Sequence, residues 1–397
     1  MRLAFLTHRV PYAPNRGDRI RAYQMLRYFK AQGISVCLVA LAHDDEEVAL
    51  AAGLTGLVDA LHVVRVPRAR NLLKAVLALS TERPLTHMLL DSGRMRPLLE
   101  QVRRQWQPDA VLAYCSGMAR FAMEPPLDTL PFVLDMVDVD SFKWEGLAQG
   151  SPGPRRWLYR REARVLRRFE AEATREARAT LVVSTREAEA LQSLDRAFAP
   201  VVLPNGVDVE AFRNAEPPST RPEVVFTGVF SYRPNEAGAL WLIEQVWPLV
   251  RQRQPHAHLT LVGTGPGATL QRRAAQAEVE VTGTVPDVRP YLWRASVAVA
   301  PLDTAHGVQN KVLEAVAAGL PAVVTPAVHE GLPDAVRPAC LVASDAAGYA
   351  DAIAQLLALS PEKRRALASR ACLDALTWET CLRPLAGILS RAAEVSA

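Results

Sequence analysis

The sequence has few aromatic residues, few cysteines and no long apolar run. Phe, Trp and Tyr make up 6% of the 397 residues, which argues against a nucleic-acid-binding protein that stacks bases on aromatic side chains. The five cysteines are odd in number and show no metal-ligand spacing, so we expect reduced, mostly buried thiols. No apolar run approaches a membrane span, and the N-terminal run is too short for a signal peptide. We therefore expect a cytoplasmic protein, and any membrane contact must be peripheral.

The rest of the composition is ordinary, but the charge is unevenly distributed. Hydrophobic residues make up 49% and charged residues 22% of the chain, as in a globular protein, and the length favours two domains over one. Residues 1–200 carry 29 Lys and Arg against 23 Asp and Glu, whereas the remainder carries 17 against 19. This excess favours an anionic partner for the first half, such as phosphates or an acidic membrane surface. A generally Arg-rich composition explains it equally well.

Apolar runs of strand length alternate with amphipathic segments of helix length throughout the sequence. In the first half, these runs lie at residues 2–7, 33–39, 60–66, 110–114, 132–135 and 180–184. In the second half, they lie at residues 223–227, 258–262, 279–281, 297–300, 322–325 and 340–342. Such alternation predicts parallel sheets with right-handed crossovers. The expected fold class is therefore α/β, with two doubly wound Rossmann-like domains at residues 1–200 and 201–376.

The run Gly307–Val324 predicts a loop, a short helix and a buried strand. Lys311 and Glu314 are spaced to share one face of the helix. A lone glutamate on a helix is usually solvated. Here, however, the two side chains lie in the first turns of a helix that follows an apolar strand at 297–301, where open α/β sheets bind ligands. The sequence therefore predicts a ligand site around Lys311 and Glu314.

A polar loop that opens a helix is a candidate site in the first half. Gly17 would let a ligand approach the backbone, and the helix start favours anions. Arg19 and Arg21 would add charge-assisted hydrogen bonds. The alternative is an ordinary helix start without a ligand.

A second candidate follows the predicted strand at 132–135. Asp138 and Asp140 lie just past this strand, and they could hold a sugar hydroxyl, a metal or a proton. They could equally be N-caps of the segment that follows.

Residues 155–178 form a predicted long helix with nine arginines. Its apolar residues give it a rough apolar face, so one interpretation is a solvated helix that packs on the first domain. The other is a surface helix, Arg155–Arg168, that rests on anionic lipid.

Several stretches of the second half together resemble the GT-B glycosyltransferases of glycosyltransferase family four. The order and spacing of these stretches carry the resemblance over about residues 200–330; they are 203–208 (LPNGVD), 226–228 (FTG), 261–266 (LVGTGP), 283–287 (GTVPD) and 311–315 (KVLEA). The runs 232–235 (YRPN) and 307–311 (GVQNK) are most similar to sugar transferases of bacterial exopolysaccharide clusters, including those associated with exosortase systems. In the first half, 15–19 (NRGDR) and 137–141 (VDVDS) extend this narrower resemblance.

This resemblance implies a retaining glycosyltransferase of exopolysaccharide or cell-surface polysaccharide synthesis. A nucleotide-sugar would bind to the second domain and a glycan or lipid-linked acceptor to the first, with the reaction in the cleft that the domains face. Gly17, Arg19 and Arg21 would then bind the acceptor. The terminal helix, 377–397, would cross back to the first domain.

The resemblance also assigns roles around the donor. Glu314 would accept hydrogen bonds from the ribose hydroxyls, and Lys311 and Arg233 would neutralise the diphosphate leaving group. Gly228 would leave room for phosphate, and the helix start near Asn235 would add backbone donors. The backbone from Gly283 to Val285 would read the base.

At two positions the sequence departs from the family pattern. His306 stands where the family usually has an acidic residue near the transferred sugar, and it could bond a sugar hydroxyl or simply lie in the loop. Asp138 stands near the usual place of a first-domain histidine, so it is the candidate for contact with the donor sugar or acceptor. Family members retain the anomeric configuration by front-face attack, in which the leaving phosphate helps to deprotonate the acceptor. Accordingly, no metal or cofactor is expected, and the sequence shows no Ser/His/Asp or Cys/His arrangement for nucleophilic catalysis.

Two alternatives remain beside the transferase. A nucleotide-sugar epimerase on a related two-domain fold would need an acid–base set in its cleft. A non-catalytic sugar-binding or scaffold protein would be compatible with the acid lost at His306. The Lys311–Glu314 helix and the predicted Asn205-Gly206 turn favour the transferase over the epimerase. Arg233, Lys311 and Glu314 argue against the non-catalytic protein.

Overall fold

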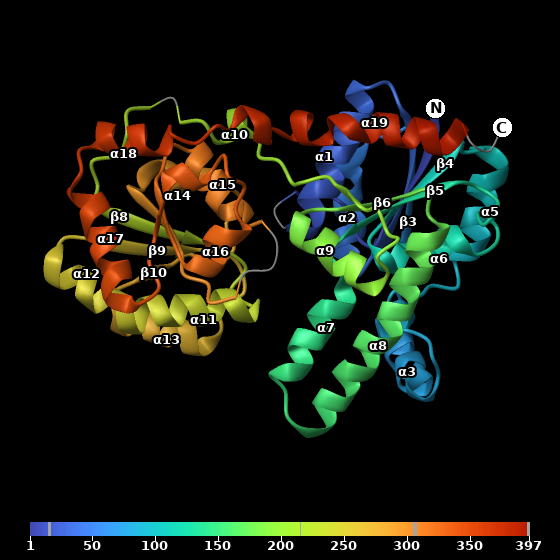
Figure 1. Ribbon diagram of the computed structural model, residues 1–397, viewed down its shortest axis with the longest axis horizontal. Helices are drawn as coiled ribbons and strands as arrows, with labels where there is room; N and C mark the ends of the chain where they lie inside the picture. Colours follow the sequence, from blue (N-terminus) through green and yellow to red (C-terminus); the bar gives the residue numbers. More distant parts are fainter. Residues whose placement is uncertain (15–16, 215, 305–307, 395–397) are drawn as a thin grey trace. The chain divides into compact units, whose positions relative to one another are not determined.

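The computed structural model describes residues 1–14, 17–214, 216–304 and 308–394, and the chain divides into two units (Figure 1). Unit 1 comprises Met1–Pro204 and Leu382–Ala397, and unit 2 comprises Asn205–Cys381. The sequence had suggested boundaries after residues 200 and 376.

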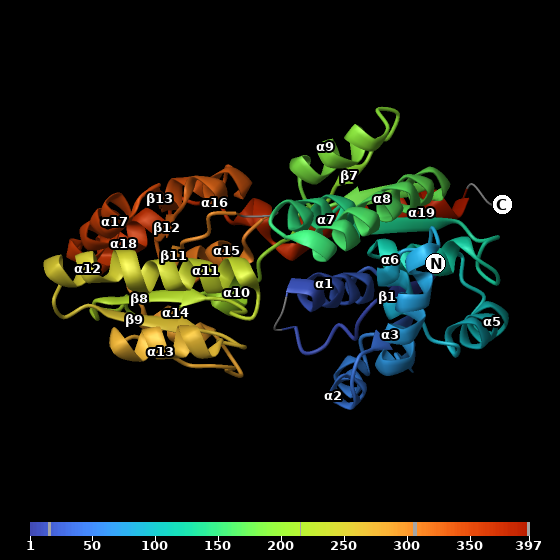
Figure 2. The same ribbon diagram turned by 90° about the horizontal axis from the view of Figure 1, so that it is seen from below.

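Unit 1 contains a seven-stranded parallel sheet in the order β3-β2-β1-β4-β5-β6-β7. Its strands are β1 (Arg2–Thr7), β2 (Ser35–Ala42), β3 (Ala60–Arg65), β4 (Ala110–Tyr114), β5 (Phe132–Val137), β6 (Ala179–Val182) and β7 (Val201–Val202). Its helices are α1 (Gly17–Ala31), α2 (Asp45–Leu50), α3 (Arg68–Leu77), α4 (Leu85–Leu89), α5 (Met95–Gln105), α6 (Ser116–Met123), α7 (Asp140–Gln149), α8 (Gly153–Glu176) and α9 (Thr185–Leu194). The boundary to unit 2 falls within α19 (Trp378–Glu394). Figures 1 and 2 both show α7 and α8 side by side.

Unit 2 contains a six-stranded parallel sheet in the order β10-β9-β8-β11-β12-β13. Its strands are β8 (Glu223–Thr227), β9 (His258–Val262), β10 (Glu280–Val281), β11 (Val297–Ala300), β12 (Ala322–Val324) and β13 (Cys340–Val342). Its helices are α10 (Val209–Phe212), α11 (Arg233–Trp241), α12 (Trp247–Arg253), α13 (Ala268–Gln276), α14 (Arg289–Arg294), α15 (Asn310–Ala317), α16 (Pro326–Gly331), α17 (Ala346–Ala358) and α18 (Pro361–Ala368). Helices α11 to α13 lie along one face of the sheet, and α14 and α15 along the other (Figure 1).

These two sheets confirm the predicted fold class. The central strands are buried on both faces because helices cover them, and they therefore read as continuous apolar runs, such as 35–42 and 322–324. In unit 2 the strand order reverses between β8 and β11. Ligands bind at such a switch point, outside the carboxyl ends of the strands.

The helix expected over 235–252 is interrupted. A π-helical turn, Leu242–Val246, separates α11 from α12. Pro248 near the start of α12 has no N–H to donate to the preceding turn. A π-helical turn is a known way to accommodate such a break in the hydrogen-bond pattern.

None of the helices in the described ranges is long and apolar enough to cross a membrane.

The segment 205–207 at the start of unit 2 lies against the segment that leads into α19. Val207 N donates to Leu376 O over 2.8 Å, and Val207 pairs with Thr377 in an isolated bridge. A Cβ at Gly206 would lie 2.6 Å from the backbone N and Cα of Trp378. Only glycine fits this close approach of two backbones without a shift.

We therefore expect Gly206→Ala to lower the free energy of unfolding by about 1–3 kcal/mol, because the added methyl group overpacks a backbone contact. The control is Gly146→Ala, since Gly146 lies within α7 and nothing lies within 4 Å of a Cβ there. This control should gain stability by about 0.4–1 kcal/mol. Denaturant titration measures both changes, and equal stability of the two variants would contradict the packing argument.

Candidate functional site

Two loops meet at the carboxyl edge of the unit 2 sheet. The loop after β8 donates from Gly228 N to Val262 O over 3.0 Å and from Phe230 N to Thr264 O over 2.8 Å. Gly263 has φ +148°, and a Cβ there would lie 1.7 Å from the Gly228 carbonyl oxygen. Position 263 therefore requires glycine, and the backbones of both loops come together at the switch point of the sheet.

Asn235 on α11 connects the β8 loop to α15. Its side-chain N–H donates to Val229 O over 2.9 Å, and its Oδ1 accepts from Lys311 Nζ over 2.6 Å. The side chain is 7% exposed. The backbone N–H of Asn235 bonds to Tyr232 O within the helix start, so the predicted role of this N–H as a ligand donor finds no support in the geometry. The structure instead gives the Asn235 side chain the task of holding Lys311.

Lys311 lies directly beside Gly228. The Lys311 ammonium group is 4.8 Å from the centroid of the Phe226 ring, which is within cation–π range. A Cβ at Gly228 would approach Lys311 Nζ to 3.3 Å and the Asn235 side chain to 3.2 Å. Glycine at position 228 therefore keeps open the space next to the ammonium group.

Lys311 and Glu314 are half-buried on the same helix. Burial lowers the pKa of Lys311 to about 7, and the charge of Glu314 opposes this shift. Burial also raises the pKa of Glu314 to about 7, opposed by Lys311. Neighbouring groups that titrate near neutral pH are typical of functional sites. An anion beside Lys311 would favour its charged form.

The loop after β10 continues the same edge. Thr282 Oγ1 accepts from Gly263 N over 3.4 Å, and Thr284 Oγ1 donates to Thr264 Oγ1 over 2.8 Å. Gly283 has φ +67°, a conformation that favours glycine, and Val285 is half-buried against the core. Hydrogen bonds thus join the loops after β8, β9 and β10 along the predicted ligand edge.

Two further residues predicted at the donor site are Arg233 and His306. Arg233 is exposed at the first position of α11, two residues before Asn235. His306 lies outside the described residues. The sequence did not single out Asn310, whose buried Oδ1 has no hydrogen-bond partner among the described residues.

In unit 1, Asp138 and Asp140 share one cation at the carboxyl end of β5. Lys143 Nζ lies 2.8 Å from Asp138 Oδ2 and 3.2 Å from Asp140 Oδ1. Ser116 Oγ donates to Asp140 Oδ2 over 3.2 Å. Burial lowers the pKa of Lys143, but Asp140 and Asp138 outweigh burial and raise it. Lys143 was not among the residues predicted from the sequence, although its i,i+3 spacing from Asp140 on α7 indicates such a pair.

Two buried glutamates receive backbone N–H groups at the start of α7. Glu187 Oε2 accepts from Val139 N over 2.7 Å, and Glu170 Oε1 accepts from Ser141 N over 3.1 Å. Burial raises the pKa of both carboxyl groups, that of Glu170 to about 8. These residues fix the segment that carries Asp138 and Asp140.

The predicted acceptor residues in α1 have interior partners. Arg21 is 1% exposed, and its guanidinium donates to Asp135 Oδ2 over 2.8 Å and to Leu203 O over 2.9 Å. Arg19 is 7% exposed and donates to Glu47 Oε1 over 2.9 Å. Gly17 begins α1. The positions of the two arginines indicate that they hold the fold of unit 1, and acceptor binding by them finds no support in these positions.

The long arginine-rich helix is present as α8, but its arginines are not all at the surface. Arg161 is 5% exposed, so the interpretation of the whole Arg155–Arg168 stretch as a lipid-facing surface is wrong at this residue. Arg167 pairs with Glu145 over 2.5 Å, and Arg168 pairs with Glu82 over 2.6 Å.

Within the described ranges, no three or more His, Cys, Asp or Glu residues are grouped so that they could hold a metal ion.

Two family models match the sequence. The model described as "Glycosyl transferase 4-like domain" matches residues 16–206, and the model described as "Glycosyl transferases group 1" matches residues 221–359. A comparison with curated proteins finds no match.

Solved structures share the fold over almost the whole chain. Anabaena HepE, crystallised with UDP and glucose and with UDP-glucose, is 14% identical, with TM-scores of 0.68 and 0.69. These matches cover 98% of this chain and 100% of HepE. A variant of S. aureus TarM, crystallised with Fondaparinux, alpha-GlcNAc-glycerol and UDP, is 10% identical, with a TM-score of 0.68. That match covers 98% of this chain and 99% of the TarM chain.

Two doubly wound parallel sheets and these structural neighbours define the class as a two-domain Rossmann-like protein of the GT-B fold. The two family matches together span most of the chain, and the protein belongs to the glycosyltransferases. The coarser part of the resemblance seen in the sequence is thereby confirmed.

The buried Glu170 carboxyl group yields a pH-dependent prediction. Its pKa rises from 4.5 to about 8 in the fold, so the neutral carboxyl stabilises the protein fully below about pH 4.5, and this contribution is lost as the pH rises through 8. Between pH 5 and pH 9, Glu170→Gln should lose less stability than wild type, by more than about 1 kcal/mol. Chemical denaturation at the two pH values measures this difference.

The control is Glu172→Gln, because Glu172 is exposed on the same helix. This variant should follow the wild-type pH dependence. A Glu170→Gln variant with the wild-type pH dependence would contradict the assignment of a neutral buried carboxyl.

Proposed function

We propose that the protein transfers a sugar from a nucleoside diphosphate sugar to a glycan or lipid-linked acceptor, with retention, in exopolysaccharide or cell-surface polysaccharide synthesis. The observation that carries the proposal is Lys311, held by Asn235 beside Gly228 at the switch point of the unit 2 sheet. The UDP and UDP-glucose complexes of HepE, which shares this fold, are consistent with such a donor.

In the proposed donor complex, Lys311 and Arg233 neutralise the diphosphate, and Glu314 accepts hydrogen bonds from the ribose hydroxyls. Gly228 leaves space for a phosphate, and Gly283 and Val285 contact the base. Negative charge grows on the diphosphate as the bond between the sugar and its oxygen breaks, so a fixed cation there lowers the barrier. His306 would contact the transferred sugar.

Retention follows when the acceptor hydroxyl attacks from the face that the diphosphate leaves. The hydroxyl oxygen bonds to the anomeric carbon, the bond to the diphosphate oxygen breaks, and the proton passes to the departing phosphate. Asp138, positioned by Lys143, would contact the sugar or the acceptor. Metal ions are not needed in this scheme. The epimerase alternative is not favoured, because the family matches are to glycosyltransferases.

A lipid-linked acceptor would bring the protein to a membrane surface as a peripheral protein. The predicted membrane contact through Arg155–Arg168 remains part of the proposal for those arginines that are exposed on the surface. Arg155, Arg156 and Arg160 are exposed near the start of α8.

Replacement of the two donor-site charges tests the site. Lys311→Gln and Glu314→Gln should each weaken the binding of a nucleoside diphosphate about 10- to 100-fold, because each removes a charged hydrogen-bond partner. Isothermal titration calorimetry measures this change. Lys363→Gln and Glu362→Gln are the matched controls, since both residues are exposed on α18. Wild-type affinity in both donor-site variants would refute the assignment.

The reaction itself is tested after a thermal-shift screen with UDP-, GDP-, ADP- and TDP-sugars, because a bound ligand raises the melting temperature by mass action. With the sugar nucleotide that binds, we expect release of nucleoside diphosphate that depends on an added acceptor and is lost in Lys311→Gln. Chromatography of the products measures this release. Conversion to an isomeric sugar nucleotide without acceptor would support the epimerase instead.

A further inference from the structure

An apolar strip is exposed on α3 of unit 1. Leu72, Leu73, Val76 and Leu77, here called the α3 strip, are 62, 63, 56 and 70% exposed. Single exposed aliphatic side chains are ordinary on protein surfaces. Four on one face of a ten-residue helix form a contiguous patch, which is typical of an interaction site.

The opposite face of α3 is fixed to the rest of unit 1. Asn71 is 0% exposed, and its side-chain amide donates to Leu89 O over 3.1 Å and to Asp91 O over 2.6 Å. Lys74 Nζ lies 2.6 Å from Asp91 Oδ2, and Ala75 is buried. A rotation of α3 that buried the strip would break these contacts. The contacts on the opposite face therefore keep the strip exposed.

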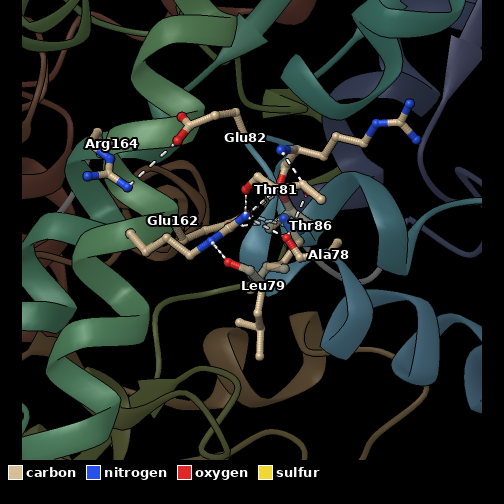
Figure 3. Close-up of polar contacts among 10 residues, drawn as sticks. Ala78, Leu79, Thr81, Glu82, Thr86, Glu162 and Arg164 are labelled. Carbon is tan, nitrogen blue, oxygen red and sulfur yellow. Dashed lines mark hydrogen bonds and ion pairs between the residues drawn. The ribbon is translucent and has the colours of Figure 1, made fainter.

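Two charged residues of α8 hold the segment that follows α3. The Arg161 guanidinium donates to the carbonyl oxygens of Ala78, Leu79, Thr81 and Arg83. Glu162 Oε2 accepts from Leu85 N over 3.0 Å, and its Oε1 accepts from Thr86 N over 3.0 Å. Figure 3 shows this segment, from Ala78 to Thr86, against α8, with Glu82 facing Arg164. The C-terminal end of α3 is therefore anchored to α8.

The charged residues of α3 itself are all basic. Helix α3 contains no acidic residue, and Arg68 and Arg70 are exposed at its start. On α8, Trp157 is 59% exposed next to the exposed Arg156. Aliphatic residues on one face of a helix with arginines beside them are characteristic of helices that lie in the interface of an anionic bilayer.

A second copy of the chain fits the strip less well. A stable protein interface takes roughly 20–30 residues from each side, and a two-fold contact would place the same basic residues opposite one another.

We propose that the α3 strip docks unit 1 onto an anionic lipid surface, with the strip in the bilayer interface and Arg68 and Arg70 at the lipid phosphates. This proposal rests on the proposed function, because a lipid-linked acceptor would lie at the membrane surface. The step beyond that function is the assignment of α3, rather than α8 alone, as the membrane-contacting element.

Co-sedimentation of the full chain with vesicles tests the proposal. The probes are phosphatidylcholine vesicles with and without 30% phosphatidylglycerol. Wild type should bind the anionic vesicles more tightly than the neutral ones. Leu73→Gln/Leu77→Gln and Arg68→Gln/Arg70→Gln should each weaken binding by about tenfold or more. The matched control is Val342→Gln, because Val342 is an exposed aliphatic residue of unit 2, 47% exposed; it should bind as wild type does.

Absence of wild-type binding, or undiminished binding by the leucine variant, would overturn the proposal. Light scattering provides a second test, because a dimeric wild type that becomes monomeric in Leu73→Gln/Leu77→Gln would assign the strip to a second copy instead. Thermal shifts with sugar nucleotides are measured for every variant. Retained shifts with lost vesicle binding locate the defect in docking, whereas the absence of any shift in wild type would count against the proposed function alone.

Discussion

The proposed donor site depends on one buried amide. Asn235 donates to the loop after β8 and accepts from Lys311 of α15, so a single side chain ties together the elements on the two sides of the switch point. The glycines around it follow from this arrangement, because Gly228 leaves room beside the ammonium group and Gly263 lets the adjacent loop approach. Within the described residues, Asn235 Oδ1 is the hydrogen-bond acceptor that fixes the position of the half-buried Lys311, and the loss of an acceptor from a buried charged group is costly.

In unit 1, the charged residues at the carboxyl end of β5 are arranged differently. There, Lys143 is shared by Asp138 and Asp140, and the buried Glu170 and Glu187 receive the backbone N–H groups of the same segment. Unit 2 thus presents a cation whose burial disfavours its charge, whereas unit 1 presents carboxylates held by a cation. In the proposed reaction, the first arrangement would bind the anionic donor, and the second would accept hydrogen bonds from sugar hydroxyl groups.

The sequence predicted the elements of this structure better than the partners of individual side chains. Buried parallel strands and the Lys311–Glu314 helix were recognisable because strand length, apolar runs and helical spacing are local properties. The role of Asn235 was not, since its partner Lys311 is 76 residues away. Arg21 was likewise expected to bind the acceptor, but it is buried and pairs with Asp135, which is 114 residues away in the sequence. In α8 the periodicity predicted the helix, but only the tertiary contacts reveal that Arg161 faces inward.

The central claim is that Lys311 binds the diphosphate of the donor. Proton uptake when a nucleoside diphosphate binds tests this claim most directly. At pH 8 a lysine with a pKa of about 7 is mostly neutral, while Glu314, also near 7, is mostly ionised. Calorimetry at pH 8 in buffers of different ionisation enthalpy should show that nucleoside diphosphate binding takes up a proton fraction approaching about one, and that Lys311→Gln abolishes this uptake. Binding without proton uptake, or the same uptake in Lys311→Gln, would contradict the account.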